Sequence, residues 1–586
     1  MNFIIRCRTH NFLLLTLILL SLAVVFITTG ALRSSAETNN NQESRENKSS
    51  AQNWRRRMLV GKETFGKETF GRFDSPTKRF AAPFSQTMKS LLEASAVGDL
   101  DTTFGAGGKV TTRIGNSQSE ALAAAVQTDG KTVAAGYSFN TADADFALAR
   151  YNADGSLDAS FGAGGKVTTD FGGDNFILAL VIQPADGKLV AAGSSSNGAN
   201  DDFALARYNT DGTLDASFGT GGKVTTDFGG NSSDYIDGVA LQADGKIIAA
   251  GYRFNGSFFH FALARYNADG SLDASFGAGG KIITMLTAFD DLARAVVIQT
   301  DGKIVVAGEA NADFAVARYN SDGTLDSSFG TGGTVITSIN VFDSAYDVVL
   351  QADGKILAAG ESGDGNNADF ALLRYTSSGA LDSTFGAGGI VTTAIGAGDE
   401  IASSLAAQAS GKIIVGGFSF NGANADFALA RYNTDGSLDG SFGTGGKILT
   451  DFGGGAFDYI NALVLQSNNR VIGFGSSNSN FAAAAYVLET ANCSYSLSPL
   501  SASFPSGGGT GSFNVSAPNG CSYTAVSSVS WITITSGASG SGNGFVGFSV
   551  AANSGASRTG TITVGGQTFT IGQAAFRRKK ILLSPL

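Results

Sequence analysis

The chain has 586 residues, 43% of them hydrophobic and 15% charged, a composition that excludes a mainly disordered protein. Its 79 glycines against 7 prolines indicate many tight turns. The formal net charge is −10, and the acidic side chains are concentrated in residues 99–490, which argues against a nucleic-acid partner because an acidic surface repels polyanions.

Residues 1–36 have the pattern of an export signal. Arg6 and Arg8 precede the uncharged run 12–32, and small residues lead up to Ala36. We predict cleavage near Ala36, with retention of the long apolar run as a membrane anchor as the alternative. Both outcomes place the rest of the chain outside the cytoplasm.

Residues 37–98 are polar and basic. A segment of this composition cannot bury enough apolar surface to fold, so we expect a largely disordered linker.

A repeated motif dominates residues 99–490. The string L-D-x-S/T-F-G-x-G-G occurs seven times at intervals of 53–58 residues, a period typical of repeat architectures. Its aspartates are Asp101, Asp158, Asp215, Asp273, Asp326, Asp382 and Asp439.

Each repeat contains four short segments with strand character, which we name by letter. Strand A is the apolar run ending in Gln, strand B follows Asp-Gly-Lys, strand C contains F-A-L-A-R-Y and strand D contains K-V-T-T. Asp-Gly between two β-rich runs, as in residues 239–251, predicts a hairpin because both residues tolerate positive φ. No repeat sustains a helical apolar period.

The two ends of the repeat region predict a closed ring. The region begins with a D strand at 109–113 that has no partner before it, and it ends with an A-B-C set at 459–487 that has no D strand after it. A ring lets the first strand complete the last unit and removes exposed sheet edges. The predicted fold is therefore all-β, with a seven-bladed β-propeller over residues 99–490.

The repeats also resemble a known family. Residues 145–172, DFALARYNADGSLDASFGAGGKVTTDFG, look like the delta-60 repeat of bacterial exported proteins. The resemblance implies a propeller-like array and does not imply a particular reaction.

Residues 491–575 contain several short strand-like segments with Ser/Gly turns and no acidic residue. The segments at 528–537 and 550–573 are similar to the BACON domain. The resemblance implies a small immunoglobulin-like β-sandwich with a role in glycan or mucin attachment, and Trp531 is its candidate contact residue. A basic tail, residues 576–586, follows.

Cysteine and histidine usage narrows the chemistry. Cys7 lies in the predicted signal, so Cys493 and Cys521 remain as an even pair that can form a disulfide in an oxidising compartment. His10 also lies in the signal, which leaves His260 as the single histidine of the exported chain. One histidine excludes a histidine-rich metal site and argues against a Ser-His-Asp relay.

A calcium loop is one interpretation of the C-to-D connection. Asn152, Asp154 and Asp158 form N-x-D-G-x-x-D, with oxygen ligands around a glycine turn, and similar sets recur in other repeats. The alternative is that these residues only build the turn. In the copy at 376–382 the first two positions become Thr and Ser while Gly379 stays, which favours the turn. We therefore predict no cofactor, with calcium as the alternative.

Six repeats carry an arginine in strand C. We expect these arginines to pair with the repeated carboxylates within or between blades. They are Arg150, Arg207, Arg265, Arg318, Arg374 and Arg431.

The loops of the predicted ring divide into two faces. In an up-and-down blade the D-to-A and B-to-C loops emerge on one side, and the A-to-B and C-to-D loops on the other. The latter are nearly uniform, whereas the B-to-C loops range from EANA at 309–312 to RFNGSFFH at 253–260. We call the two sides the variable face and the constant face, and we expect any binding specificity on the variable face.

The variable face offers amides, carboxylates and aromatic rings, which suit a sugar surface or a protein loop. A solvated acidic rim without a ligand is the alternative. The candidate contact residues are Asn255, Phe258, Phe259, Asp290, Asp291, Asp399, Glu400, Phe420 and Asn421. Related positions are Asn140, Asn197, Asn366, Asn367, Asp234, Asp343 and Asp458.

Taken together, these patterns predict a secreted or cell-surface binding or adhesion protein without catalytic activity. We expect a monomer that contacts an extracellular glycan or protein, with no nucleic-acid partner and no membrane insertion beyond an N-terminal anchor. One alternative is a carbohydrate-active enzyme, a glycoside hydrolase or lyase, that uses carboxylates of the variable face. The other alternative is a structural cell-surface spacer.

Overall fold

The computed structural model describes residues 96–230, 232–489, 494–518 and 521–577, and its regular elements are all β-strands. Among these residues no helix is long and apolar enough to cross a membrane. Two compact units divide the chain, one with the repeat strands up to Leu488 and one from Glu489 onward. The predicted signal, nearly all of the linker and most of the basic tail lie outside the described residues.

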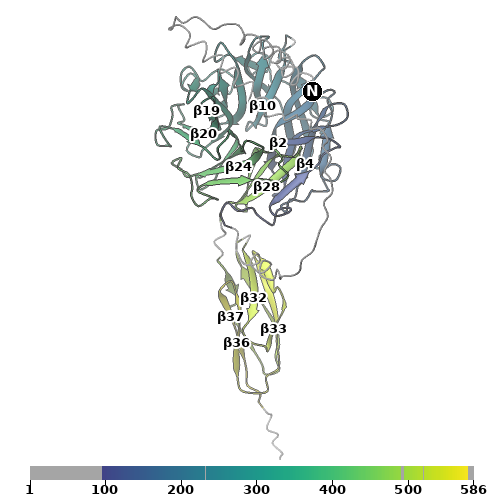
Figure 1. The fold of residues 1–586 in the computed structure, drawn as a ribbon. Helices are drawn as coiled ribbons and strands as arrows, with labels where there is room; N and C mark the ends of the chain where they lie inside the picture. Colours follow the sequence, from purple (N-terminus) through teal and green to yellow (C-terminus); the bar gives the residue numbers. More distant parts are fainter. Residues whose placement is uncertain (1–95, 231, 490–493, 519–520, 578–586) are drawn as a thin grey trace, which may run out of the picture. The chain divides into compact units, whose positions relative to one another are not determined.

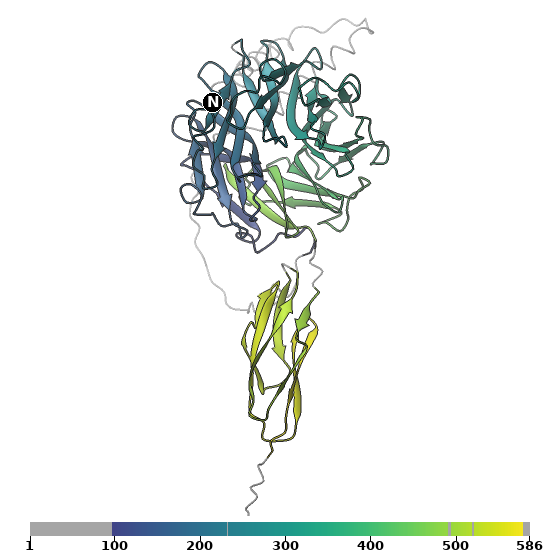
Figure 2. The same ribbon diagram turned by 180° about the vertical axis from the view of Figure 1, so that it is seen from behind.

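Seven four-stranded antiparallel sheets form the first unit and are arranged as a ring of blades (Figures 1 and 2). Every sheet has the order A-B-C-D, and consecutive A strands contact one another around the centre of the ring. The predicted seven-bladed propeller is confirmed. Blade 1 begins at β2, and blade 7 combines β26, β27 and β28 with β1.

The strands of each class occupy equivalent places in their blades. The A strands are β2 (Ser119–Val126), β6 (Asn175–Ile182), β10 (Asp234–Leu241), β14 (Asp291–Ile298), β18 (Phe342–Leu350), β22 (Glu400–Ala407) and β26 (Asp458–Gln466). The B strands are β3 (Thr132–Phe139), β7 (Leu189–Ser196), β11 (Ile247–Phe254), β15 (Ile304–Ala310), β19 (Ile356–Gly363), β23 (Ile413–Phe420) and β27 (Arg470–Ser477). The C strands are β4 (Ala144–Tyr151), β8 (Asp201–Tyr208), β12 (Phe259–Tyr266), β16 (Asp313–Tyr319), β20 (Ala368–Tyr375), β24 (Ala425–Tyr432) and β28 (Asn480–Val487). The D strands are β5 (Lys166–Thr169), β9 (Lys223–Thr226), β13 (Lys281–Thr284), β17 (Thr334–Thr337), β21 (Ile390–Thr393), β25 (Lys447–Thr450) and β1 (Lys109–Thr112).

The first strand closes the ring. Strand β1 pairs antiparallel with β28, with Lys109 opposite Ala484 and Thr112 opposite Phe481. The N-terminal strand therefore completes the last blade, as the unpaired ends of the repeat region predict.

A buried tyrosine ends each C strand from β4 to β24 and holds the blade to the one before it. The Tyr208 hydroxyl donates to Thr169 Oγ1 of the preceding blade at 3.0 Å, and Tyr266 donates to Thr226 in the same way at 2.9 Å. Both side chains are fully buried, and burial raises their pKa. Each bond satisfies a buried polar group across an interface that is otherwise apolar.

The C-strand arginine makes the second contact between blades, on the constant face. In blade 1 the Arg150 Nε donates to Asp158 Oδ2 at 2.8 Å, and the guanidinium lies over the Phe161 ring with 4.6 Å to its centroid. Arg150 Nη1 also donates to the carbonyl of Thr210 in the next blade, and Lys131 Nζ lies 2.9 Å from Asp158 Oδ2. The predicted pairing of arginines with repeated carboxylates is confirmed, and the partner is the Asp of the L-D-x-S/T-F-G motif.

Blade 7 makes the same contact with a different strand. Ala485 stands where the other blades have the arginine, and Arg470 stands where they have the lysine. Arg470 lies 3.0 Å from Asp101 Oδ2, lies over the Phe104 ring and donates to the carbonyl of Ala153 in blade 1 at 2.6 Å. Arg470 thus makes, at the point where the ring closes, the contacts that an arginine and a lysine share in the other blades.

The second unit is a β-sandwich of two sheets. One sheet has the order β29 (Ser496–Ser498), β31 (Gly509–Ser516), β35 (Gly544–Val550) and β33 (Ile532–Ser536). The other has the order β30 (Ser501–Phe504), β37 (Gln567–Gln573), β36 (Arg558–Val564), β32 (Ser522–Ser527) and β34 (Ser539–Ser541). The core includes Phe513 stacked on Phe569 with 4.3 Å between ring centroids.

The arginine exchange in blade 7 yields a stability prediction. We expect Arg470→Lys to lower the free energy of unfolding of the propeller by about 1–3 kcal/mol, because lysine keeps a charge near Asp101 but loses the Ala153 bond and the Phe104 contact. Adding Ala485→Arg restores the arrangement of the other blades and should regain most of the loss. Calorimetric unfolding of both variants measures this; equal losses in the single and double variants would contradict it.

The motif aspartates predict how stability depends on pH. Hydrogen bonds, first from Lys131 and then from Ser160, hold the pKa of Asp158 well below its usual range. A carboxylate with a lowered folded-state pKa stabilises the fold above the unfolded pKa of about 4, and this stabilisation is lost as the pH falls through the folded value. We expect the propeller melting temperature to fall steadily below about pH 4. In Asp158→Asn the same acidification should cost less, which a melting series across pH measures.

Candidate functional site

The loops of the propeller lie on the two faces that their order predicts. At the end of β3 the Phe139 amide donates to the carbonyl of Gln118 at 2.8 Å, which joins a B-to-C loop to a D-to-A loop. On the other side Lys131, from an A-to-B loop, meets Asp158 of a C-to-D loop. The variable and constant faces are therefore distinct surfaces.

The predicted asparagines of the variable face build their own loops. Asn255 Oδ1 accepts the amides of Ser257 and Phe258, at 2.8 and 2.9 Å. Asn421 Oδ1 accepts the amides of Ala423 and Asn424 in the corresponding loop of blade 6. Both side chains shape the turn through local bonds, so their oxygens are directed at the backbone.

Two of the predicted carboxylates are completely buried and serve the D-to-A turns. Asp291 and Glu400 open their A strands with 0% exposure. Asp291 accepts the amides of Leu286 and Thr287 at 2.8 and 3.1 Å, and Glu400 accepts the amide of Gly396 at 3.0 Å. The prediction that these two residues contact a ligand is wrong, because neither side chain has surface to offer.

The related Asp234 has the same position and the same burial. Its Oδ2 accepts the Phe228 amide at 2.8 Å, and burial raises its pKa to about 7. The first position of the A strand is thus a buried anchor for the preceding turn, which sequence alone does not distinguish from an exposed acid.

Asp290 and Asp399 link the D-to-A loop to a C strand. Asp290 Oδ1 accepts the amide of Phe259 at 3.0 Å, and Asp399 Oδ1 accepts the amide of Ala368 at 2.9 Å. Asp290 keeps part of its surface, whereas Asp399 is buried. These aspartates hold neighbouring loops of the variable face together.

The aromatic side chains are what the variable face exposes. Phe258 is 36% exposed and meets Phe289, 39% exposed, edge to face at 5.7 Å between centroids. Phe420 stacks on Phe457, which is 45% exposed, at 6.4 Å between centroids. Phe259 packs inward on Tyr252 and Phe254 instead. Phe258 and Phe420 are among the predicted contact residues, whereas their D-to-A partners, Phe289 and Phe457, are not.

The contacts of the C-to-D loop fit the turn interpretation and leave little room for the calcium alternative. Asp158 Oδ2 is held by Lys131 and Arg150, and its Oδ1 accepts the amide and hydroxyl of Ser160. Asp154 Oδ1 accepts the amide and hydroxyl of Ser156, and Asn152 donates to that same hydroxyl at 3.0 Å. Two cationic side chains already neutralise Asp158, so the motif builds the C-to-D turn and the contact between blades.

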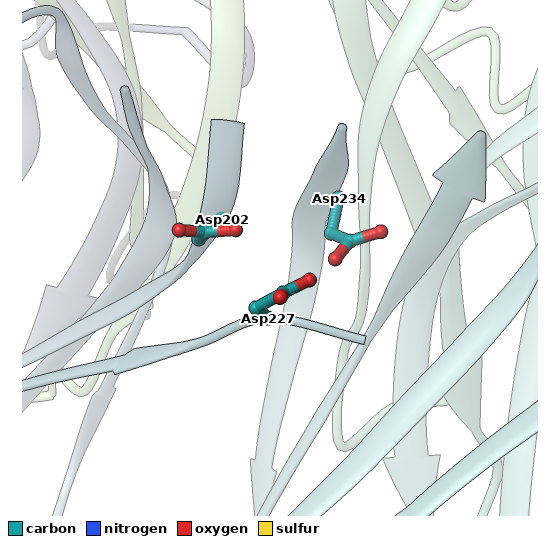
Figure 3. A group of neighbouring side chains, drawn as sticks. All are labelled: Asp202, Asp227 and Asp234. Carbon is teal, nitrogen blue, oxygen red and sulfur yellow. The ribbon is translucent and has the colours of Figure 1, made fainter. Parts of the chain in front are cut away.

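Two other acidic clusters lie on the variable face. In the cluster Asp202, Asp227 and Asp234, shown in Figure 3, one oxygen of each carboxylate lies within 4.8 Å of the others. The cluster Asp426, Asp451 and Asp458 has the same geometry where blade 6 meets blade 7. The grouping of these acids was not predicted from the sequence. The pattern that could have indicated it is the segment T-D-F-G-G, which has one further acid before it and one after it in the chain.

A hollow of about 900 Å³ opens on the constant face, at the A-to-B loops of blades 2 to 4. Its lining repeats one motif and includes Gln183, Gln242, Asp244, Gln299 and Asp301. Because these loops are nearly uniform among the blades, the hollow does not carry the loop variation expected of a specificity site.

In the sandwich, Trp531 and Cys521 occupy structural positions. The Arg558 guanidinium covers the Trp531 ring with 4.2 Å to its centroid, so that face of the ring is in use. Cys521 is fully buried and disulfide-bonded. Its predicted partner Cys493 lies outside the described residues, and the pairing stays a prediction.

Comparison with known families now adds to this geometry. Six segments match the β-propeller family described as "Domain of unknown function (DUF5122)", and residues 494–572 match the viral BACON domain. The chain contains six DUF5122 propeller repeats and a BACON-like domain. The six segments are 127–161, 185–218, 242–276, 299–329, 351–385 and 408–442. The seventh blade of this DUF5122 propeller is assembled from both ends of the repeat region.

Solved structures similar to parts of this chain include polysaccharide lyase Uly1, at 10% identity over 68% of this chain and 98% of that chain, with a TM-score of 0.37. Sqt1 of Chaetomium thermophilum has 13% identity over 64% and 96% of the two chains, with a TM-score of 0.36. A GH5 xyloglucanase of Bacteroides ovatus has 22% identity over 14% of this chain, with a TM-score of 0.13; this chain covers 19% of its length. No curated protein matches significantly.

Proposed function

We propose that the protein is a secreted or cell-surface binding protein that recognises an extracellular glycan or protein through the variable face, without catalysing a reaction. One observation carries the proposal. Every exposed aromatic side chain in the described part of the propeller, Phe258, Phe289 and Phe457, lies in a loop of the variable face. Exposed rings cost free energy in water, and their clustering on the face with varied loops is typical of a contact surface.

The polar surroundings favour a glycan. Apolar faces of sugar rings stack on aromatic side chains, and Phe457 is an exposed ring that lies nearly parallel to Phe420 and Tyr459. Exposed carboxylates nearby, among them Asp451, can accept hydrogen bonds from sugar hydroxyls. The BACON-like domain supports the same direction, as its resemblance implies a role in glycan attachment.

The buried carboxylates support binding rather than catalysis. A glycosidase needs two carboxyl groups that reach the substrate from both sides. Asp291 and Glu400, which sequence reasoning placed on the surface, are instead fully buried and accept backbone amides.

The disulfide supports the proposed location. Disulfides persist in oxidising compartments outside the cytoplasm, and the bonded Cys521 fits the export pattern of residues 1–36. The proposal includes both fates of residues 1–36, cleavage with release of the chain and retention as a membrane anchor.

A binding experiment tests the proposal. We expect the exported chain to bind members of a glycan array, and Phe457→Ala to weaken that binding at least about tenfold, since buried aromatic contacts dominate such interfaces. Leu449→Ala is the matched control, because Leu449 is similarly exposed, at 49%, but lies on a D strand.

The outcomes separate the function classes. Equal binding by wild type and Phe457→Ala contradicts a role for this part of the variable face. Release of shortened or unsaturated sugars from the bound glycan would favour the enzyme. A folded chain that binds no glycan and no extracellular protein would favour the spacer.

A further inference from the structure

Three carboxylates meet where blade 6 joins blade 7. Asp426 is the second residue of β24, Asp451 follows β25 and Asp458 opens β26. One oxygen from each lies within 4.8 Å of the others. The Lys109 ammonium is nearby, but it donates to the main-chain carbonyl of Asp451 at 3.0 Å. Three negative groups therefore share a small space on the variable face.

The buried member of this cluster has an oxygen without a partner. Asp458 is 0% exposed, and its Oδ2 accepts the amide of Phe452 at 2.8 Å, whereas its Oδ1 is buried and accepts no hydrogen bond. Asp426 Oδ1 is likewise buried and unpartnered. Such oxygens call for a ligand that supplies positive charge.

Other blades provide an internal comparison. In blade 4 the middle position is Ser338, and the buried Asp343 has both oxygens satisfied, with Ser362 Oγ donating to Oδ1 at 2.6 Å. Blade 5 repeats this arrangement with Ala394 at the middle position and Glu400 satisfied by a serine of β23. The same B-strand serine stands opposite Asp458, as Ser477, but its hydroxyl makes no hydrogen bond to Asp458 Oδ1.

Two further blades carry a basic side chain in the set. Blade 3 has His260 at the first position, with Nδ1 3.5 Å from Asp291 Oδ2, and blade 7 has Arg113 at the middle position. A second complete acidic set is the one in blade 2, Asp202, Asp227 and Asp234 (Figure 3). There the Ser232 hydroxyl donates to Asp234 Oδ1 at 3.0 Å, so the buried acid is less in need of a ligand than Asp458.

We propose that Asp426, Asp451 and Asp458 bind a divalent cation of the calcium class. The donor set consists of oxygen alone, which hard cations prefer, and it lacks the nitrogen and sulfur ligands of zinc or copper sites. Three carboxylates provide enough charge to hold the ion, and loop carbonyls and water can supply the remaining ligands that calcium takes.

The cation would also fix the loop that presents Phe457. Asp451 and Asp458 stand at the two ends of residues 451–458, a loop with three consecutive glycines at positive φ. An ion that bridges both ends restricts the conformations open to these glycines. Without it, ordering the loop costs more conformational entropy. Only this consequence rests on the proposed function; the cation site itself does not.

Titration calorimetry tests the site. The chelator-treated full chain is titrated with calcium chloride, and we expect saturable binding with a dissociation constant of about 10⁻³ M or tighter. Asp451→Ala should remove one binding site, and it should fold, because blade 5 carries Ala394 at the same position. Asp451→Asn keeps an oxygen for the Gly453 amide, loses the charge, and should weaken that site at least about tenfold.

Asp369→Ala is the matched control, since Asp369 holds the position of Asp426 in blade 5, where the set is incomplete. It should titrate as the wild type does, and calcium should raise the propeller melting temperature in both. Absence of saturable calcium binding in the wild type overturns the proposal. So does an Asp451→Ala chain that is folded by calorimetry and titrates like the wild type. Loss of glycan binding in Phe457→Ala with calcium binding intact would leave the cation site standing.

Discussion

Each blade of this propeller packs against the face of its neighbour. An equivalent polar contact crosses every junction between blades. The arginine of strand C makes this contact: it neutralises the motif aspartate of its own blade and donates to a carbonyl of the next. A buried arginine and aspartate without each other would be strongly destabilising. The pair therefore balances its own buried charges and links consecutive blades, and blade 7 makes the same contact with Arg470 in place of the usual arginine.

On the variable face, too, most polar side chains serve the fold itself. Most of its amides and carboxylates are consumed in building loops: asparagines bend the B-to-C turns, and buried acids at the start of the A strands collect the amides of the preceding turns. What remains for contact with other molecules is a small number of phenylalanine rings and exposed acids. Function on this surface thus depends on residues that the loops do not need for their own structure.

Much of the fold can be predicted from the sequence because the same pattern of strands and turns recurs seven times. Alternation of apolar and turn residues predicts four strands, and the unpaired segment at 109–113 predicts closure. The site is less predictable. Asp291 and Asp290 are adjacent in sequence, yet one is buried and the other partly exposed, because Asp291 opens β14 and accepts amides of the preceding turn whereas Asp290 still lies in the loop. The pairing of Phe420 with Phe457 joins loops 37 residues apart, and no local pattern indicates it.

The order of strands in blade 7 has a mechanical consequence. The chain leaves the ring from β28, which lies between β27 and β1, and not from an edge strand. Tension applied beyond Leu488 must draw out a strand that is bonded on both sides, so two ladders resist it together. If the D strand were the last in the chain, the same tension would have to break only the single ladder that joins it to its C strand. Because β1 pairs with β28, the strand from which the chain leaves the ring is held by two ladders instead of one.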